Sequence, residues 1–202
     1  MQQGGQTRVL AITGGIASGK SRFVKAFAAL GVPCLDTDLV ARTIHQDPTH
    51  PATLALAQAF PQAMADDGRL ARGSLRAIFA HDRSANEELK RILRPHVLAE
   101  AERWALAQVA PYVVWEAALL RDQRIPADRV LEISAPPAVR LARLAQRNPD
   151  WSATQAASIM ALQSAQRGEP ADDMVVNDGP ESAIEAIVAQ LHQRYLTLWS
   201  LA

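Results

Sequence analysis

The feature that most constrains this chain is a glycine-rich segment between a short apolar run and an amphipathic segment. Residues 14–21 read Gly-Gly-Ile-Ala-Ser-Gly-Lys-Ser and satisfy the pattern G-x-x-x-x-G-K-[ST]. The apolar run 9–13 before them is typical of a buried strand, and Phe23, Phe27 and Leu30 after them recur on one helix face. Amides turned inward at the start of a helix form a nest for phosphate oxygens. The segment therefore predicts a phosphate-binding loop inside a strand–loop–helix unit.

Each position of this loop has an expected task. Lys20 is expected to reach the β- and γ-phosphates of a nucleotide, and the Ser21 hydroxyl is expected to hold Mg²⁺. The phosphate oxygens would be cradled by the residues before them, namely Gly14, Gly15, Ile16, Ala17, Ser18 and Gly19. The loop predicts that this chain binds a nucleoside triphosphate and Mg²⁺.

The rest of the chain alternates between strand-like and helix-like segments. Apolar runs at 32–35, 112–115, 129–133 and 174–176 predict further strands, and a helical stripe from Ile184 to Leu198 predicts the last helix. Residues 138–167 are helical in pattern with a break at 148–150, after which Ser152 and Gln155 have capping-box spacing. Strands alternating with helices predict an α/β fold with a central parallel sheet in three α/β/α layers.

We expect this core to comprise residues 1–38 and 111–202, with a lid at about 140–168. Residues 39–110 are helical in character and too long for a simple crossover between strands. They are therefore expected to form a helical insertion that holds a second substrate.

Composition excludes several classes of protein. Lys plus Arg equals Asp plus Glu at 21 each, and this balance argues against a nucleic-acid partner. No stretch approaches the length of a membrane span, the N-terminus does not have the pattern of a secretion signal, and the five histidines lack metal-ligand spacing. The lone cysteine, Cys34, is interpreted as a small buried hydrophobe. A cytoplasmic monomer or weak homo-oligomer is expected.

Three carboxylates stand at predicted strand ends. Asp38 is either a base that accepts a proton from an attacking hydroxyl or, like Asp36, a cap for the helix that begins near Leu39. Glu116 ends the third strand, where it either organises Mg²⁺ or serves the fold. Spacing alone leaves these alternatives open.

Arginines gather in the predicted lid. Arg143 and Arg147 lie four residues apart on one helix face, with Arg140 one turn earlier and Arg167 at the far end of the segment. They form either a solvated charged face or a clamp on the transferring phosphoryl group; the upstream loop favours the clamp. Asn177 begins an Asn-Asp-Gly sequence that is either an ordinary turn or a contact to the nucleotide base or ribose.

The order of these motifs resembles the dephospho-coenzyme A kinase family from about Val9 to the C-terminal helix. The loop, the Asp36-Thr37-Asp38 segment, the sequence 67–72 that ends in Arg72, and Ala171-Asp172 followed by Asn177 and Gly179 carry the resemblance. It implies that Asp38 is the catalytic base, that Lys20 and Arg143 assist catalysis, and that Arg147 and Asn177 bind the nucleotide. Arg72 and Arg94, with Asp38, would bind the acceptor.

The resemblance implies transfer of the ATP γ-phosphate to the ribose 3′-hydroxyl of dephospho-CoA. The chain departs from the family pattern at Ala17, where glycine is usual and alanine requires a negative φ, and at Arg94, Ala118 and Asp122 on the acceptor side. A kinase of the same fold with another nucleotide or hydroxyl acceptor is therefore one alternative. A non-catalytic ATP-binding module is the other.

Overall fold

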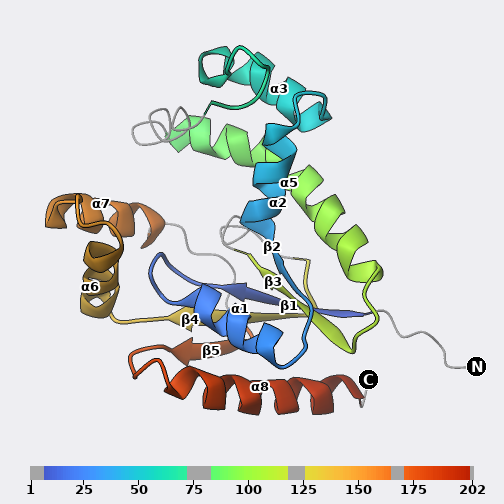
Figure 1. Ribbon diagram of the computed structural model, residues 1–202, viewed down its shortest axis with the longest axis vertical. Coiled ribbons are helices and arrows are strands. Elements are labelled where there is room, and N and C mark those ends of the chain that lie inside the picture. Colours follow the sequence, from blue (N-terminus) through green and yellow to red (C-terminus); the bar gives the residue numbers. More distant parts are fainter. Residues whose placement is uncertain (1–6, 72–82, 118–125, 165–170, 201–202) are drawn as a thin grey trace, which may run out of the picture. The chain divides into compact units, whose positions relative to one another are not determined.

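A computed structural model describes residues 7–71, 83–117, 126–164 and 171–200 of the chain. The chain folds into two compact units, residues 1–35 with 105–202, and residues 36–104 (Figure 1). Across the described residues, no helix is both long and apolar enough to cross a membrane.

The first unit is built on a five-stranded sheet in the order β2-β3-β1-β4-β5. The strands are β1 (Arg8–Thr13), β2 (Cys34–Asp36), β3 (Tyr112–Glu116), β4 (Arg129–Ser134) and β5 (Asp173–Val176). β1 pairs in parallel with β3 and β4, and β4 pairs in parallel with β5. The predicted α/β fold with a parallel sheet is confirmed, and β1 lies at its centre.

Alternate residues of the central strands face one hydrophobic core. α1 (Lys20–Ala29) packs against α8 (Ala183–Ser200), and both cover the same side chains of the sheet (Figure 1). Period-two alternation in strands and 3.6-residue periodicity in helices bring these side chains to one face each. The buried members are Leu10, Ile12, Phe23, Phe27, Val32, Tyr112, Val114, Leu131, Ile133, Ile184, Val188 and Tyr195.

Two members of the predicted helical stripes lie outside the core. Leu30 is exposed because α1 ends at Ala29 and Gly31, at φ +81°, turns the chain back. The amides of Leu30 and Val32 bond to the Phe27 carbonyl at this turn. Leu198, near the end of α8, is exposed as well.

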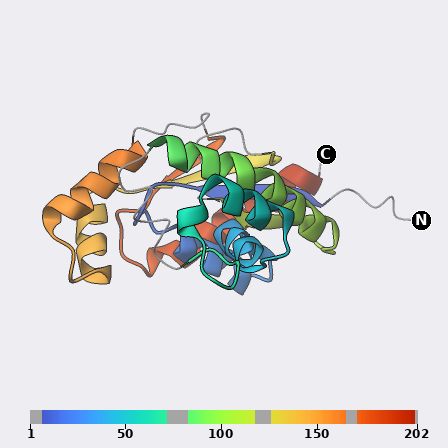
Figure 2. The same cartoon turned by 90° about the horizontal axis from the view of Figure 1, so that it is seen from above.

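The helical pair α6 (Pro137–Arg147) and α7 (Ala153–Ser164) follows β4, and the two helices lie side by side (Figures 1 and 2). The break between them is where the sequence predicted it. Gln155 N–H donates to Ser152 Oγ at 3.1 Å and the Gln155 side chain accepts from Ser152 N–H at 2.8 Å. This is the predicted capping box.

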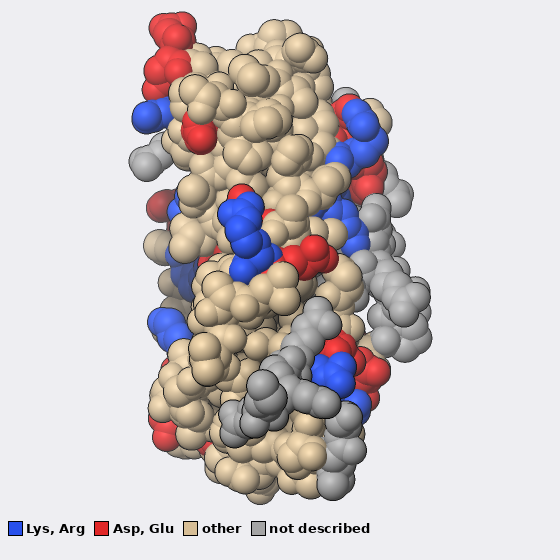
Figure 3. Space-filling model, turned by 90° about the vertical axis from the view of Figure 1, so that its right-hand side faces the viewer, with Lys and Arg blue, Asp and Glu red and all other residues tan. Residues whose placement is uncertain are grey.

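The second unit contains α2 (Thr37–Gln46), α3 (Pro51–Ala59), a 3₁₀ turn η1 (Pro61–Ala63) and α5 (Arg83–Leu106), which extends slightly beyond it. The helical character expected for this region is therefore present in the described residues. On the face shown in Figure 3, basic and acidic side chains lie next to one another. α5 carries two exposed ion pairs, Arg91–Glu88 and Arg103–Glu100. Such exposed pairs are screened by solvent, so we assign them no part in holding the fold.

A cluster of polar side chains lies at the amino-terminal edge of the sheet, where the strands β4 and β5 begin. The Asp173 carboxylate, 7% exposed, accepts from Arg129 Nε at 2.5 Å, from Arg194 Nη2 at 3.0 Å and from the Tyr195 hydroxyl at 3.0 Å. The hydrogen bond from Arg129 is the main cause that lowers the pKa of Asp173, and the bond from Tyr195 lowers it further. The cluster links β4, β5 and α8.

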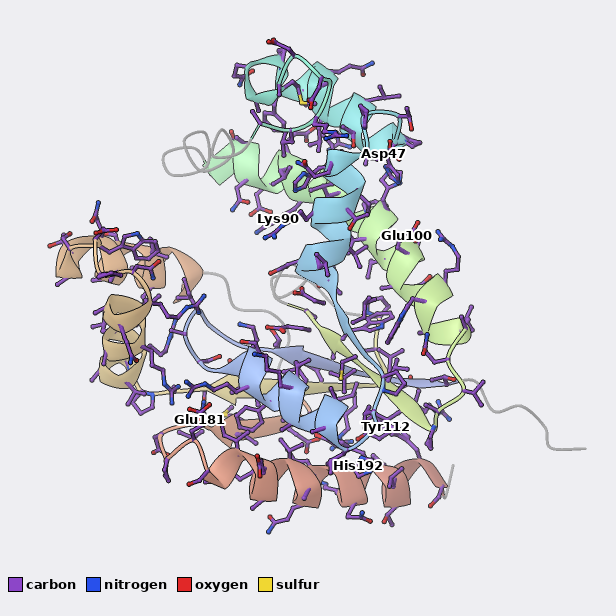
Figure 4. The ribbon with its side chains drawn as sticks, viewed as in Figure 1. Asp47, Lys90, Glu100, Tyr112, Glu181 and His192 are labelled. Carbon is purple, nitrogen blue, oxygen red and sulfur yellow. The ribbon has the colours of Figure 1, made fainter. Side chains whose placement is uncertain are left out.

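A second polar contact on α8 lies nearby in the fold. Tyr112 of β3 and His192 of α8 point toward each other, with the Tyr112 hydroxyl 2.6 Å from His192 Nδ1 (Figure 4). The rings of Tyr112, Tyr195 and Trp199 contact one another in edge-to-face and tilted arrangements, with centroids 5.0–6.1 Å apart. These contacts fix α8 against the start of the sheet.

We expect Asp173→Asn to lower the free energy of unfolding by about 2–4 kcal/mol, because it leaves buried donors of Arg129 and Tyr195 without their charged acceptor. Urea unfolding would measure the change. Asp150→Asn, at an exposed position between α6 and α7, is the matched control and should change it by less than about 0.5 kcal/mol. Equal effects from the two variants would contradict the role of the cluster.

The contribution of Asp173 should depend on pH. Its pKa is lower in the folded protein than the ordinary value of 3.8, so the carboxylate stabilises the fold fully above that ordinary value. As pH falls through the lowered pKa, this stabilisation is lost. The difference in unfolding free energy between wild type and Asp173→Asn should therefore be constant near neutrality and shrink in acid. A constant difference down to the lowest pH at which both variants fold would contradict this.

Candidate functional site

The predicted phosphate loop joins β1 to α1, as its sequence context requires. Gly14 has φ +148°, and a β-carbon there would lie 2.1 Å from the Ile133 carbonyl oxygen. Gly19 has φ +101°, and a β-carbon there would lie 2.2 Å from Asn177 Nδ2. Only glycine fits at these two positions, because the backbone passes so close to β4 and to Asn177.

The N-terminus of α1 is open to an anion. Its first residue is Lys20, no side chain caps it, and no acidic residue stands in its first turn. The first amides of a helix carry a partial positive charge and lack partners within the helix. These amides and the loop amides before them therefore suit phosphate oxygens.

Lys20 and Ser21 lie where the motif predicts. The Lys20 ammonium donates to the carbonyl oxygens of Gly14 at 3.0 Å and Gly15 at 3.3 Å, so its charge lies over the loop. Ser21 follows in the first turn of α1 with an exposed side chain. The hydroxyls of Thr13 and Ser18 are buried and have no hydrogen-bond partner among the described residues. The loop thus offers a cation and polar hydrogen-bonding groups to a ligand.

Ala17 corrects one expectation. The substitution of glycine by alanine required a negative φ, but φ at Ala17 is +59°, in the left-handed region. A β-carbon in that region costs about 1–2 kcal/mol. Apolar contact accompanies this strain, because Ile16 and Ala17 pack against side chains of α6, α7 and the turn between them. The buried side chains are Leu144, Ala156 and Met160, and Leu141 and Trp151 pack against the same cluster.

Arg143 and Asn177 approach the loop from outside. Arg143 Nη1 donates to the carbonyl oxygens of Ala17 at 3.4 Å and Ser18 at 3.2 Å, and its Nη2 donates to the Asn177 carbonyl at 3.2 Å. Asn177 is buried, and its Nδ2 donates to the Ser18 carbonyl at 2.8 Å. Both side chains therefore touch the loop backbone. Arg147, one helical turn further along α6, is exposed.

Arg140 is the residue that sequence reasoning noticed but did not place. Its Nε donates to the Ile16 carbonyl at 2.8 Å. A β-carbon on Gly15 would lie 2.6 Å from Arg140 Nη2 and 2.8 Å from Cζ, so the guanidinium occupies the space beside that glycine. In the sequence, its position one turn before Arg143 was the only indication that Arg140 could approach the loop.

The two aspartates at the end of β2 differ in what they do. Asp36 Oδ1 accepts from the amides of Asp38 at 2.9 Å and Leu39 at 3.2 Å, so Asp36 caps α2. Asp38 stands in the first turn of α2 with an exposed side chain. The structure thus assigns the cap to Asp36, and Asp38 is an exposed residue of the first turn.

The other residues singled out from the sequence lie on β3, on α5 or outside the described ranges. Glu116 ends β3 with a half-buried side chain, and Arg94 is half-buried in the middle of α5. Among the described residues, no group of three or more His, Cys, Asp or Glu side chains forms a metal site. The residues outside the described ranges are Arg72, Ala118, Asp122 and Arg167.

The surroundings of Cys34 disfavour a nucleophilic role. The thiol is half-buried and lies 3.3 Å from the Val32 carbonyl and 3.6 Å from the Val24 carbonyl. Burial, with the nearby charge of Glu116, raises the pKa of Cys34 to about 11. The thiolate that nucleophilic chemistry needs is thus disfavoured.

Comparison with known proteins agrees with this geometry. The family model described as dephospho-CoA kinase matches residues 8–182. The dephospho-CoA kinase of Salmonella typhimurium strain LT2 is 38% identical over 197 residues, which cover 95% of this chain and 94% of that protein. The enzyme of the same name from Escherichia coli K12 is 37% identical and covers 95% of each chain.

Solved structures share the fold. The crystal structure of TT1252 from Thermus thermophilus superposes with a TM-score of 0.73 at 25% identity, covering 94% of this chain and 98% of that one. Dephospho-CoA kinase from Campylobacter jejuni gives a TM-score of 0.58 at 19% identity, covering 95% and 98%. At that identity the second likeness concerns the fold alone.

We expect Ala17→Gly to raise the free energy of unfolding by about 0.5 kcal/mol, because relief of the left-handed strain exceeds the added flexibility of glycine in the unfolded chain. Ala142→Gly, on the exposed face of α6, is the matched control and should lower it by about 1 kcal/mol. Thermal unfolding of both variants measures the two effects. The same loss of stability in both would contradict strain at residue 17.

Proposed function

This chain belongs to the dephospho-CoA kinase family, and from that premise we propose which of its residues transfer the ATP γ-phosphate to the ribose 3′-hydroxyl of dephospho-CoA. The family membership makes the chain a phosphotransferase that acts in the final step of coenzyme A biosynthesis. The observation that carries the residue assignment is the phosphate loop with Lys20 at the start of α1.

The nucleotide binds through its phosphates. The loop amides and the N-terminus of α1 donate hydrogen bonds to the phosphate oxygens, and Lys20 moves its ammonium from the loop carbonyls to the β- and γ-phosphates. Ser21 supplies a hydroxyl ligand to Mg²⁺. When bound, Mg²⁺ neutralises charge on the phosphates and helps to align them. Glu116, at the end of β3, would bind water around the ion.

Asp38 acts as the general base. Its exposed carboxylate accepts the proton of the 3′-hydroxyl as that oxygen forms its bond to the γ-phosphorus. The bond between the γ-phosphorus and the bridging oxygen breaks, and ADP leaves with the electron pair. Asp36, two residues earlier, takes no part in this step because it caps α2.

The arginines of α6 stabilise the charge that develops during transfer. Arg143 is already at the loop, where it bonds the carbonyls of Ala17 and Ser18, and Arg147 lies one turn beyond it. Guanidinium groups suit phosphoryl oxygens because they offer several N–H donors in one plane. Asn177 is the further residue that binds the nucleotide. Residues 36–104, with Arg94 and Arg72, hold the acceptor.

We expect Asp38→Asn to lower kcat with dephospho-CoA by about 10²–10⁴-fold, because the amide cannot accept the hydroxyl proton. ADP release from Mg·ATP, measured with and without dephospho-CoA, gives the result. Asp36→Asn is the matched control: asparagine caps a helix as well as aspartate does, so activity should stay close to that of wild type.

Two outcomes would contradict parts of this proposal. Equal kcat values for Asp38→Asn and wild type would remove Asp38 as the base. ADP release that is stimulated by other nucleotides or hydroxy compounds but not by dephospho-CoA would leave the loop assignment standing and overturn the acceptor.

A further inference from the structure

The phosphate loop is held from outside by donors to three consecutive carbonyl groups, those of residues 16–18. Arg140 Nε bonds the first at 2.8 Å, Arg143 Nη1 bonds the second and third, and Asn177 Nδ2 bonds the third. Arg140 and Arg143 come from the same face of α6, and Asn177 follows β5. The function proposed above has no task for Arg140.

The Ile16 carbonyl determines how the next amide points. A trans peptide is planar, and its C=O and N–H groups point in opposite directions. Among the described residues no peptide bond is cis. A guanidinium that holds the Ile16 carbonyl therefore also fixes the direction of the Ala17 amide, which points the opposite way. A phosphate-binding nest depends on the directions of such N–H groups.

The backbone at this point is unfavourable by itself. Ala17 has φ +59°, which an L-residue adopts only at a cost. Alternative conformations of the loop with a negative φ at Ala17 therefore compete with the observed one. The bond from Arg140 and the apolar contacts of Ile16 and Ala17 with α6 and α7 favour the observed conformation.

The lack of a side chain at Gly15 leaves room for the Arg140 guanidinium. Its φ lies outside the left-handed region, so backbone conformation does not by itself require glycine here. A β-carbon would nevertheless lie 2.6–3.1 Å from three atoms of the Arg140 guanidinium. The Arg140 guanidinium can therefore occupy this position only because residue 15 is a glycine.

We propose that Arg140 is a positioning residue of the phosphate loop, which holds the Ile16 peptide and covers Gly15 so that the loop is ready for ATP before the nucleotide arrives. The proposal rests on the function given above, since it takes the ATP phosphates as the ligand of the loop. Arg140 acts through the loop backbone, in contrast to a residue that contacts phosphate directly.

The geometry requires a guanidinium and not merely a positive charge. The bond to Ile16 comes from Nε, while the Nη groups lie beside Gly15. A lysine has one terminal ammonium and cannot occupy both places, so Arg140→Lys keeps the charge and loses the arrangement. Arg140→Lys therefore separates positioning from simple attraction of an anion.

We expect Arg140→Lys and Arg140→Gln each to raise the KM for ATP about 10–100-fold, the range for loss of a charge-assisted hydrogen bond, with kcat at saturating ATP nearly unchanged. In the nucleotide-free protein, both should increase hydrogen exchange at the amides of residues 15–19. Arg103→Gln, which removes an exposed arginine paired with Glu100 on α5, is the matched control and should change neither quantity.

The outcomes distinguish this inference from the proposed function. Wild-type ATP affinity in Arg140→Lys, with unchanged loop amides in both nucleotide-free variants, would overturn positioning and leave only a charge effect. If Lys20→Met weakens ATP binding while both Arg140 variants bind normally, the inference fails and the function stands. If wild type does not bind ATP, the function itself fails.

A double-mutant cycle provides an independent check of the same contact. Gly15→Ala should weaken ATP binding in the wild-type background, because its methyl group displaces the Arg140 guanidinium. In the Arg140→Gln background that clash is smaller, so Gly15→Ala should have a clearly smaller effect on affinity. Additive losses from the two changes would overturn the proposal.

Discussion

The phosphate loop depends on hydrogen bonds that come from outside it. A cradle for phosphate needs several amides turned inward, and this leaves the loop carbonyls turned outward and in need of donors. Here α6 and the end of β5 supply the donors for residues 16–18. The helix that carries the proposed phosphate-clamping arginine is therefore also the helix that shapes the loop. A change in the position of α6 would therefore alter both the loop conformation and the position of this arginine.

The sheet order explains why these partners meet. β1 is central, with β3 on one side and β4 on the other, so the loop after β1 lies at the carboxyl edge where the chain order of the strands reverses. α6 follows β4 directly, and Asn177 follows β5, the next strand outward. Residues about 120 and 160 positions from the loop in sequence thus reach it through short connections from neighbouring strands.

Local patterns in the sequence predicted the parts of the structure that depend on neighbouring residues. The strand–loop–helix unit around Lys20, the break between α6 and α7 and the capping box of Ser152 and Gln155 were all found from spacing. The family and the parallel α/β fold were predicted and are confirmed. These features follow from periodicity and local hydrogen bonding, which a short window of sequence contains.

What the sequence did not disclose depends on contacts between distant segments. Which aspartate caps α2 could not be read from spacing, because it depends on the direction of the Asp36 side chain. The expectation of a negative φ at Ala17 was wrong because contacts with α6 and α7 accompany a conformation that local preference disfavours. The contact of Arg140 with Gly15 joins residues 125 positions apart, and no local pattern encodes it.

The two ends of the sheet differ in how fully their polar groups are hydrogen-bonded. At the amino-terminal edge, the buried carboxylate of Asp173 has three donors and its pKa is lowered accordingly. At the carboxyl-terminal edge, Ala17 is strained and the buried hydroxyls of Thr13 and Ser18 lack partners among the described residues. Unsatisfied groups and strain are tolerated where a ligand completes the site and where the rest of the fold is secure. In the described residues, the strain and the unpartnered hydroxyls thus lie at the edge that carries the phosphate loop, and the well-bonded carboxylate lies at the opposite edge.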